Sequence, residues 1–182
     1  MIFRKTKIKD VVICEPNIYG DSRGYFMESF NKEEFEKNTE KKISFCQDNE
    51  SKSTYGVLRG LHFQKPPYAQ SKLVRVIEGK VLDVVVDLRK NSNTFGEHVS
   101  VVLDDEFKRQ LFVPKGFAHG FVVLSETAIF SYKVDIYYKA SSEDSIIYND
   151  SSLNIDWNLP FSDIKLSDKD KINNKFIDAY KF

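Results

Sequence analysis

The sequence predicts a mainly β fold, either a sandwich or a barrel. From residue 56 to residue 135, short apolar segments follow one another at spacings of about ten residues and are separated by turn-forming residues. No long amphipathic helix interrupts this series. Phe and Tyr, which favour strands, are frequent, and aromatic residues make up 14% of the chain. Many short strands with regular turns are typical of these two architectures.

The bulk properties exclude several classes of function. A chain of 182 residues fits one domain, and we expect residues 1–182 to form it. Basic and acidic residues number 27 each, so no net charge attracts nucleic acid or an anionic membrane. Cys14 and Cys46 form no CxxC motif, which argues against a zinc knuckle or a thioredoxin-like site. Without an apolar signal peptide or membrane span, we expect a soluble, cytoplasmic protein with no nucleic-acid or membrane partner.

The segment before residue 56 predicts two strands and one helix. Residues 11–15 indicate a short strand, residues 20–24 a glycine-containing loop, and residues 25–30 an alternating second strand. Asn31 is a helix N-cap candidate because Glu34 follows three residues later, as in a capping box. The lysine-rich end of this helix predicts a short element.

The central strands come next, and a helix is expected near the end. Residues 73–77 and 81–88 flank Glu78-Gly79-Lys80, which predicts a hairpin. Further strands are expected at residues 98–103, 109–113, 121–124 and 128–134. A helix is expected at residues 169–176, and Gln47-Asp48-Asn49 is typical of a polar turn.

Two histidines lie in glycine-rich segments of the strand series. His62 closes Gly56-Val57-Leu58-Arg59-Gly60-Leu61-His62, and His119 closes Pro114-Lys115-Gly116-Phe117-Ala118-His119. A histidine in a core commonly satisfies its ring with one hydrogen bond, but an imidazole is also the usual general base near neutral pH. Arg59 and His62 are three residues apart and would face opposite sides of a regular strand, but a bulge at Gly60 would place them on one face. A cavity with a histidine and several cations suits an anion or a developing oxyanion.

A metal site is not expected at these histidines. A His-x-His ligand pair would need a second histidine where Gln64 stands, and no glutamate follows at a useful spacing. Two imidazoles and one amide are a poor ligand set for a first-row transition metal.

Two further polar side chains are expected on the same face of a strand as nearby apolar residues. Tyr132 lies two residues from both Phe130 and Val134, so all three face the same side of the predicted strand. This position suits either a core tyrosine or a proton donor inside a cavity. Lys72 has the parity of Val74, and a lysine on the apolar face of a strand is unusual unless it is paired or functional. By contrast, Asp168 and Asp170 are on composition an ordinary charged helix start.

Taken together, the residues resemble one enzyme family along nearly the whole chain. The marks of the resemblance are Asp21-Ser22-Arg23-Gly24, Glu28, Gln47-Asp48-Asn49, Leu58-Arg59-Gly60-Leu61-His62-Phe63-Gln64, Lys72, Pro114-Lys115-Gly116-Phe117-Ala118-His119-Gly120-Phe121, Tyr132-Lys133, Glu143 and Leu166-Ser167-Asp168-Lys169-Asp170. In this order they resemble dTDP-4-dehydrorhamnose 3,5-epimerase, an enzyme of deoxysugar biosynthesis. The resemblance implies a cupin-type, jelly-roll β-barrel with short flanking helices.

The resemblance also implies roles for individual residues. His62 would be the base and Asp170 would orient it, Tyr132 would be the acid on the opposite face, and Lys72 would stabilise the enolate oxygen. The remaining implied substrate contacts are Arg23, Arg59 and Lys169 for the pyrophosphate or neighbouring oxygens, Glu28, Gln47 and Asn49 for the nucleoside, and His119 and Glu143 for the rest of the pocket. The family uses no metal and no redox cofactor, and it forms homodimers, often with exchanged N-terminal strands.

The sequence leaves alternatives open around this core. Residues 134–138, Val-Asp-Ile-Tyr-Tyr, stand where many relatives carry Cys-Thr-Asp before the tyrosines, and such peripheral residues can set the choice of nucleotide or sugar. A C3-only epimerase, or one acting at C3 or at C3 and C5 of a GDP-linked 4-keto-6-deoxyheptose, would keep the same chemical residues. The alternative of another class is a cupin that binds a sugar nucleotide without turning it over.

Overall fold

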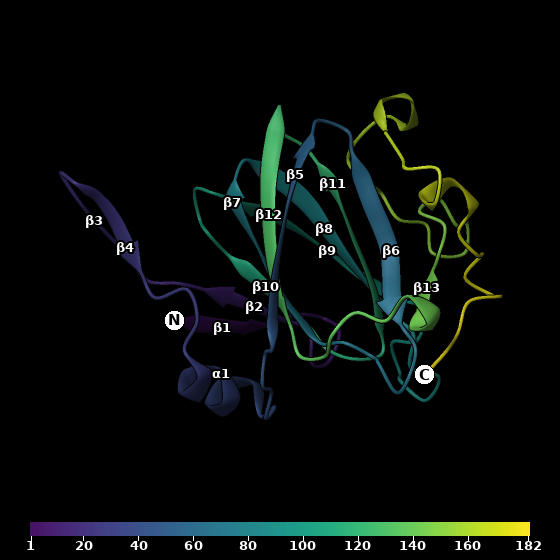
Figure 1. Cartoon of the computed structure of the whole chain (residues 1–182), viewed down its shortest axis with the longest axis horizontal. Coiled ribbons are helices and arrows are strands. Elements are labelled where there is room, and N and C mark those ends of the chain that lie inside the picture. The colour runs from purple at the N-terminus through teal and green to yellow at the C-terminus, as the bar shows by residue number, and fades with distance from the viewer.

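The computed structural model describes residues 1–182 and consists of two antiparallel β-sheets, an N-terminal hairpin and short helices (Figure 1). The six-stranded sheet has the order β1 (Ile2–Lys5), β2 (Val12–Glu15), β10 (Gln110–Val113), β7 (Lys72–Glu78), β12 (Thr127–Val134) and β5 (Gln47–Thr54). The five-stranded sheet has the order β13 (Glu143–Ser145), β6 (Leu58–Gln64), β11 (Phe117–Val123), β8 (Lys80–Asp87) and β9 (His98–Asp104). The predicted mainly β, jelly-roll class is confirmed, but the two sheets remain separate, so the architecture is a sandwich and not a closed barrel.

The main core lies between the two sheets. It is built from buried apolar side chains of both, such as Val74 of β7, Val85 of β8 and Leu111 of β10. The outer face of the six-stranded sheet is covered by the helix α1 (Lys32–Thr39) through Phe35. The outer face of the five-stranded sheet is covered by the C-terminal segment, with Trp157 fully enclosed. Because both faces of β8 are covered, seven of its eight residues are buried and its sequence does not alternate.

The N-terminal expectations are partly confirmed. α1 begins after Asn31, whose side chain accepts a hydrogen bond from the Glu34 backbone amide at 3.1 Å, as the capping pattern predicts. The loop expected at residues 20–24 is instead the tip of a hairpin between β3 (Ile18–Asp21) and β4 (Gly24–Met27), which projects from the sandwich (Figure 1). The predicted strand at residues 25–30 therefore ends at Met27.

The prediction of a hairpin at Glu78-Gly79-Lys80 is wrong. β7 and β8 belong to different sheets, so this tripeptide is a corner between the layers. The corner's amides bond to other loops: Gly79 donates to the Asp105 carboxylate and Lys80 to the Ser125 hydroxyl, both at 2.8 Å. These contacts give the turn its geometry without cross-strand pairing.

Two other local predictions are wrong. The polar turn expected at Gln47-Asp48-Asn49 is the start of β5, which pairs with β12 over its whole length. The helix expected at residues 169–176 is only the 3₁₀ turn η3 (Asp170–Ile172), and the other 3₁₀ turns are η1 (Ala140–Ser142) and η2 (Phe161–Asp163). None of the helices is long and apolar enough to cross a membrane.

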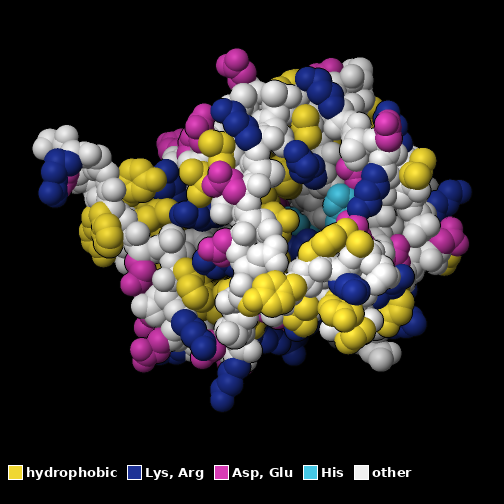
Figure 2. All heavy atoms as spheres, in the orientation of Figure 1, with side chains coloured by type: hydrophobic (Ala, Val, Ile, Leu, Met, Phe, Trp, Pro, Cys, Tyr) yellow, Lys and Arg dark blue, Asp and Glu magenta, His cyan; other side chains and the backbone are white.

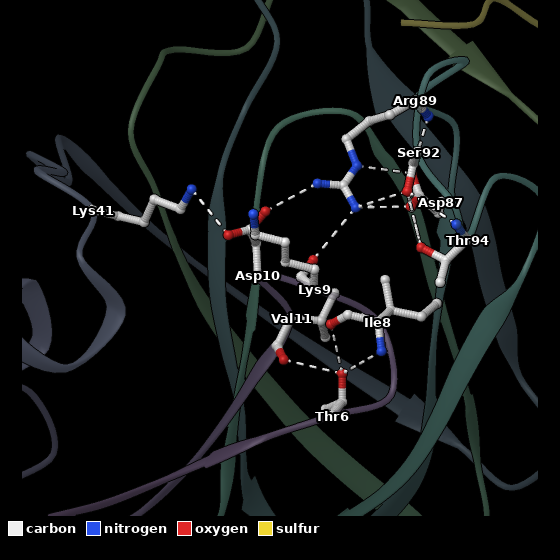
Figure 3. Close-up of polar contacts among 10 residues, drawn as sticks. All are labelled: Thr6, Ile8, Lys9, Asp10, Val11, Lys41, Asp87, Arg89, Ser92 and Thr94. Carbon is white, nitrogen blue, oxygen red and sulfur yellow. Dashed lines mark hydrogen bonds and ion pairs between the residues drawn. The ribbon is translucent and has the colours of Figure 1, made fainter.

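A cluster of ion pairs joins the two sheets outside the cavity described below. The Arg89 guanidinium donates to both oxygens of the buried Asp87 at 2.9 and 2.8 Å, and to Asp10 at 3.0 Å (Figure 3). Asp10 also pairs with Lys41 at 3.0 Å. Burial alone would raise the pKa of Asp87, but hydrogen bonds led by Arg89 hold this pKa at about 2. Asp87 ends β8 and Asp10 lies between β1 and β2, so the cluster fixes one layer against the other.

Candidate active site

A cavity of about 420 Å³ opens between the sheets, and its size suits a small-molecule site. Figure 2 shows a hollow in which histidine is visible, with Lys and Arg side chains close to it. The aromatic rings of Phe121 on β11 and Phe130 on β12 stack at 4.1 Å between centroids and form an apolar part of the wall. The polar lining consists of Glu50, Ser51, Arg59, His62, Lys72, His119, Tyr132, Ser167, Lys169 and Asp170.

The bulge expected at Gly60 is present in β6. His62 pairs with His119 and Arg59 with Phe121, so two residues of β6 lie opposite Gly120 alone. Gly60 has a φ of +142°, and a Cβ placed there would lie 2.5 Å from the Gly120 Cα. Only glycine meets both conditions without displacing the neighbouring strand. The bulge brings Arg59 and His62 to the same cavity.

His62 is held by the carboxylate of Asp170. The His62 Nε2 lies 2.5 Å from Asp170 Oδ1, although the two residues are 108 positions apart in sequence. Burial alone would raise the pKa of Asp170, but the hydrogen bonds with His62 and Ser167 hold this pKa below its ordinary value. An ionised carboxylate only accepts, so Nε2 carries the proton and Nδ1 of a neutral ring is left as an acceptor. Nδ1 has no protein partner, which is the arrangement of a general base.

A second histidine–aspartate pair lies in the neighbouring strands. The His119 Nε2 is 2.9 and 3.0 Å from the two oxygens of Asp83, and both side chains are buried. Burial raises the pKa of Asp83, while the facing His119 and Lys72 act in the opposite direction. Asp83 thereby fixes the orientation of the His119 ring in the cavity wall.

Tyr132 and Lys72 approach the cavity from the six-stranded sheet. The Tyr132 hydroxyl has no hydrogen-bond partner in the protein, and burial raises its pKa, so the phenol keeps its proton at neutral pH. The Lys72 Nζ lies 6.0 Å from the centre of the Tyr132 ring. Burial lowers the pKa of Lys72 to about 8, and the negative charges of Asp83 and Glu143 limit this fall. The structure thus places a protonated phenol and an ammonium on the side of the cavity formed by the six-stranded sheet, while His62 comes from the five-stranded sheet.

The other predicted contacts in the cavity region are two cations and one carboxylate. Arg59 donates from Nε to Ser53 Oγ at 3.1 Å and forms no ion pair. Lys169 is paired with Glu143 at 2.5 Å, and Glu143 also accepts a hydrogen bond from the Tyr138 hydroxyl at 2.7 Å. Burial alone would raise the pKa of Glu143, but these partners lower it below its ordinary value.

Glu143 and four further predicted contacts lie outside the cavity lining of this chain. Gln47 donates to Asn49 at 2.7 Å, and both side chains lie on the inward face of β5, further along the strand from the cavity. Arg23 and Glu28 are exposed in the hairpin region, where Arg23 pairs with Asp21 at 2.6 Å. The chain itself does not bring Arg23 or Glu28 to His62.

The geometry also bears on metal binding. Gln64 is buried and uses its amide in local bonds, donating to the Tyr68 carbonyl at 2.9 Å and accepting from the Lys139 amide at 2.6 Å. No group of three or more His, Cys, Asp or Glu side chains is arranged to hold a metal ion. His62 and His119 each direct one ring nitrogen at a separate aspartate.

Sequence reasoning missed three polar side chains that support the site. Asp83 is a charged residue among the buried apolar residues of β8, so the argument that singled out Lys72, a charge among apolar strand residues, would also have found it. Ser167 and Asn173 hydrogen-bond to Asp170, but they lie in irregular structure where no periodicity marks them.

Comparison with known proteins identifies the family. The family model described as dTDP-4-dehydrorhamnose 3,5-epimerase matches residues 5–178. The chain belongs to this family. It is 55% identical over 178 residues to the dTDP-4-dehydrorhamnose 3,5-epimerase of Shigella flexneri, covering 98% of this chain and 97% of the relative. Epimerases are isomerases, so the family assigns the enzyme class as well as the fold.

Solved structures of the epimerase family agree with this fold. The enzyme from Elizabethkingia anophelis superposes with a TM-score of 0.94 at 54% identity, covering 98% of this chain and 97% of that one. A 3,5-epimerase from Legionella pneumophila, solved in complex with dTDP-4-keto-L-rhamnose, has a TM-score of 0.92 at 49% identity, with 96% and 92% covered. At such identities and coverage, the sandwich is that of the epimerase family.

Proposed function

We propose that the protein inverts C3 and C5 of dTDP-4-dehydro-6-deoxy-glucose and so forms dTDP-4-dehydrorhamnose. The family membership and the relative solved with dTDP-4-keto-L-rhamnose support this substrate class. The observation that carries the mechanism is the opposition of two groups across one cavity. His62, with its free Nδ1, comes from the five-stranded sheet, and Tyr132, with its free hydroxyl, comes from the six-stranded sheet.

The reaction starts with removal of a proton next to the ketone. The 4-keto group acidifies the C–H bonds at C3 and C5 because the electrons left behind can move onto the ketone oxygen. His62 takes the proton on Nδ1, and the ionised Asp170 stabilises the imidazolium that forms. Tyr132 then donates its proton to the opposite face of the same carbon. The phenolate and the imidazolium return to their starting states by proton exchange with solvent.

The negative charge on the ketone oxygen needs a fixed positive partner. Lys72 is the cation placed beside Tyr132, and a preorganised ammonium in a water-poor cavity stabilises an oxyanion strongly. His119, held by Asp83, supplies a further polar group to the same wall. The sequence of steps moves protons only, so it requires no redox cofactor, and we expect no metal to take part.

We further propose that the chain works as a homodimer with exchanged N-terminal strands. The β3–β4 hairpin carries four exposed apolar side chains, Ile18, Tyr19, Tyr25 and Phe26, between 40% and 70% exposed. Such a patch on an element that joins neither sheet suits burial against another subunit. In this arrangement Arg23 and Glu28 would reach the partner's cavity and join Arg59, Lys169, Gln47 and Asn49 around the nucleotide. Light scattering and mixed dimers of Arg23→Ala and His62→Asn chains, which restore one intact site only with exchange, test this.

Residues 1–182 would act as one unit, since the C-terminal segment covers a sheet and also supplies Asp170. A cytoplasmic location follows from the proposed nucleotide-sugar substrate, which is made and used there.

The activity is tested by incubation with dTDP- and GDP-linked 4-keto-6-deoxy hexoses and heptoses in deuterated water. We expect deuterium at C3 and C5 of the dTDP-linked hexose, with inverted product. Deuterium at C3 alone would indicate a C3-epimerase. Preference for the GDP-linked heptose would identify that sugar nucleotide as the substrate. Binding without exchange would indicate a cupin that binds a sugar nucleotide without converting it. Activity that is lost on exhaustive chelation and restored by a stoichiometric metal would contradict the metal-free mechanism.

A further inference from the structure

We propose that Ser167 and Asn173 are positioning residues that hold the Asp170 carboxylate against His62, and that Ser145 fixes Asn173 in place. We call these three side chains the carboxylate clamp. The proposal rests on the proposed function, in which His62 is the base. Its starting point is that Asp170 lies in the 3₁₀ turn η3 at the end of an irregular segment, so no regular element sets the direction of its carboxylate.

The two oxygens of Asp170 are held from different sides. Oδ1 faces His62 Nε2 at 2.5 Å and Asn173 Nδ2 at 3.5 Å, while Oδ2 accepts a hydrogen bond from the Ser167 hydroxyl at 2.8 Å. The Ser167 oxygen in turn accepts the Asp170 backbone amide at 3.2 Å. Asp170 is only 4% exposed, so water cannot readily replace these donors. A carboxylate held at both oxygens has little freedom to rotate.

Asn173 ties this carboxylate to the strands that carry the base. Its Nδ2 also donates to the Gly60 carbonyl of β6 at 3.2 Å, and its Oδ1 accepts from the Ser145 hydroxyl of β13 at 2.8 Å. Gly60 lies two residues before His62, and Ser145 is the cross-strand partner of His62. The amide orientation is determined by its partners, because Gly60 O and Asp170 can only accept and therefore face the nitrogen. The clamp thus connects Asp170 both to β6, two residues before His62, and to the residue of β13 that pairs with His62.

The clamp fixes the relative position of His62 and Asp170, which come from distant segments of the chain. His62 belongs to strand β6, whereas Asp170 belongs to a C-terminal segment that is not a strand of either sheet. Displacement of a catalytic group by about 1 Å can lower a rate by about 10²-fold. Ser167 and Asn173 also lower the pKa of Asp170 and so favour the ionised form that His62 requires.

The test uses Ser167→Ala and Asn173→Ala with matched controls in the same part of the chain. Ser152 donates to Asp150 at 2.5 Å and Asn174 donates to Asp144 at 2.9 Å, so Ser152→Ala and Asn174→Ala remove the same kind of hydrogen bond away from Asp170. We expect each clamp variant to lower kcat on the order of 10-fold, as for loss of one hydrogen bond to a charged group, with KM changed less than about twofold. The controls should keep the wild-type kcat.

A double-mutant cycle separates positioning from general destabilisation. In an Asp170→Asn background, the clamp substitutions should cause no further loss of kcat, because they act only through the carboxylate. Ser167→Thr keeps the hydroxyl and should restore most of the activity lost in Ser167→Ala. Thermal unfolding identifies any variant that fails to fold. If Ser167→Ala is one of these, Ser167→Thr becomes the deciding variant, and a folded threonine variant whose kcat is lowered on the order of 10-fold overturns the proposal.

The outcomes distinguish failure of the clamp from failure of the proposed function. A slow Asp170→Asn variant with clamp variants at the wild-type rate overturns the clamp and leaves the dyad. Losses that multiply in the Asp170→Asn background also overturn it. Wild-type turnover in Asp170→Asn overturns both the dyad and the clamp, whereas wild-type exchange in His62→Asn rejects the proposed base itself.

Discussion

Replacing Tyr132 with phenylalanine removes one oxygen atom from the cavity and leaves the rest of the wall intact. The Tyr132 hydroxyl has no partner in the protein, so its removal leaves no buried donor or acceptor unsatisfied. We therefore expect the free energy of unfolding to change by less than about 1 kcal/mol. For a domain of 182 residues this corresponds to a change in Tm of no more than about 2–4 °C.

The catalytic effect should be much larger, and selective. The His62–Asp170 pair is untouched, so proton removal from C3 and C5 continues and His62 can return a deuteron to the face from which it took the proton. Inversion needs a donor on the opposite face, and loss of a general acid typically lowers a rate 10²–10⁴-fold. The ratio of exchanged-but-retained to inverted product should therefore rise at least roughly 10²-fold.

The ratio is measured by NMR in deuterated water with the dTDP-linked 4-keto-6-deoxy hexose. Tyr148→Phe is the matched control, because Tyr148 packs against the C-terminal core and lies outside the cavity lining. An unchanged ratio with normal turnover in Tyr132→Phe would refute the reasoning. Water or another side chain would then deliver the proton, and Tyr132 would be a packing residue.

Three further predictions follow from the same geometry. His62→Asn should lower deuterium uptake 10²–10⁴-fold while dTDP affinity, measured by calorimetry, changes little; uptake near the wild-type rate would place the base elsewhere. Because burial lowers the pKa of Lys72 to about 8, the ammonium is lost as pH rises through that value, and kcat/KM should fall above about pH 8; a profile flat to pH 10 would argue against an oxyanion role for Lys72. Gly60→Ala should lower Tm by roughly 5–10 °C, since a positive φ and a backbone clash together cost several kcal/mol, whereas Gly24→Ala, which has a positive φ of +125° but open space around it, should lower Tm less.

Local sequence signals predicted local structure well and pairing poorly. The Asn31 cap and the series of short strands appear as expected, because capping and strand propensity depend on neighbouring residues. The turn at Gly79 was predicted, but its partner strands were not, because the corner is fixed by Asp105 and Ser125 from distant loops. Alternation did not mark β8, since both of its faces are covered by other segments.

The residues of the site show the same difference between local signals and long-range pairing. Strand alternation and the bulge expected at Gly60 predicted that Arg59 and His62 share a face and that Lys72 and Tyr132 point inward, but they left open whether Tyr132 is a core residue; the structure brings all four to one cavity. The pairing of His62 with Asp170 joins residues 108 positions apart, and no pattern of spacing contains it; only the resemblance to a family suggested it. Neither strand periodicity nor the family resemblance indicated Asn173, because a single asparagine in irregular structure belongs to no periodic pattern.

The cavity differs from the rest of the interior in leaving a half-buried ammonium, that of Lys72, without an ion-pair partner. His119 is paired with Asp83, whereas Lys72 forms no ion pair although it stands in a strand with the buried Val74 and Val76. Removing an ammonium from water without a direct ion pair destabilises the folded chain, and the lowered pKa of Lys72 reflects that cost even though Asp83 and Glu143 act against it. A sequence selected only for stability would place an apolar side chain there. In the mechanism proposed above, the same desolvation would strengthen the attraction between Lys72 and the oxyanion, so that an unfavourable contribution to folding would become a favourable one in the transition state.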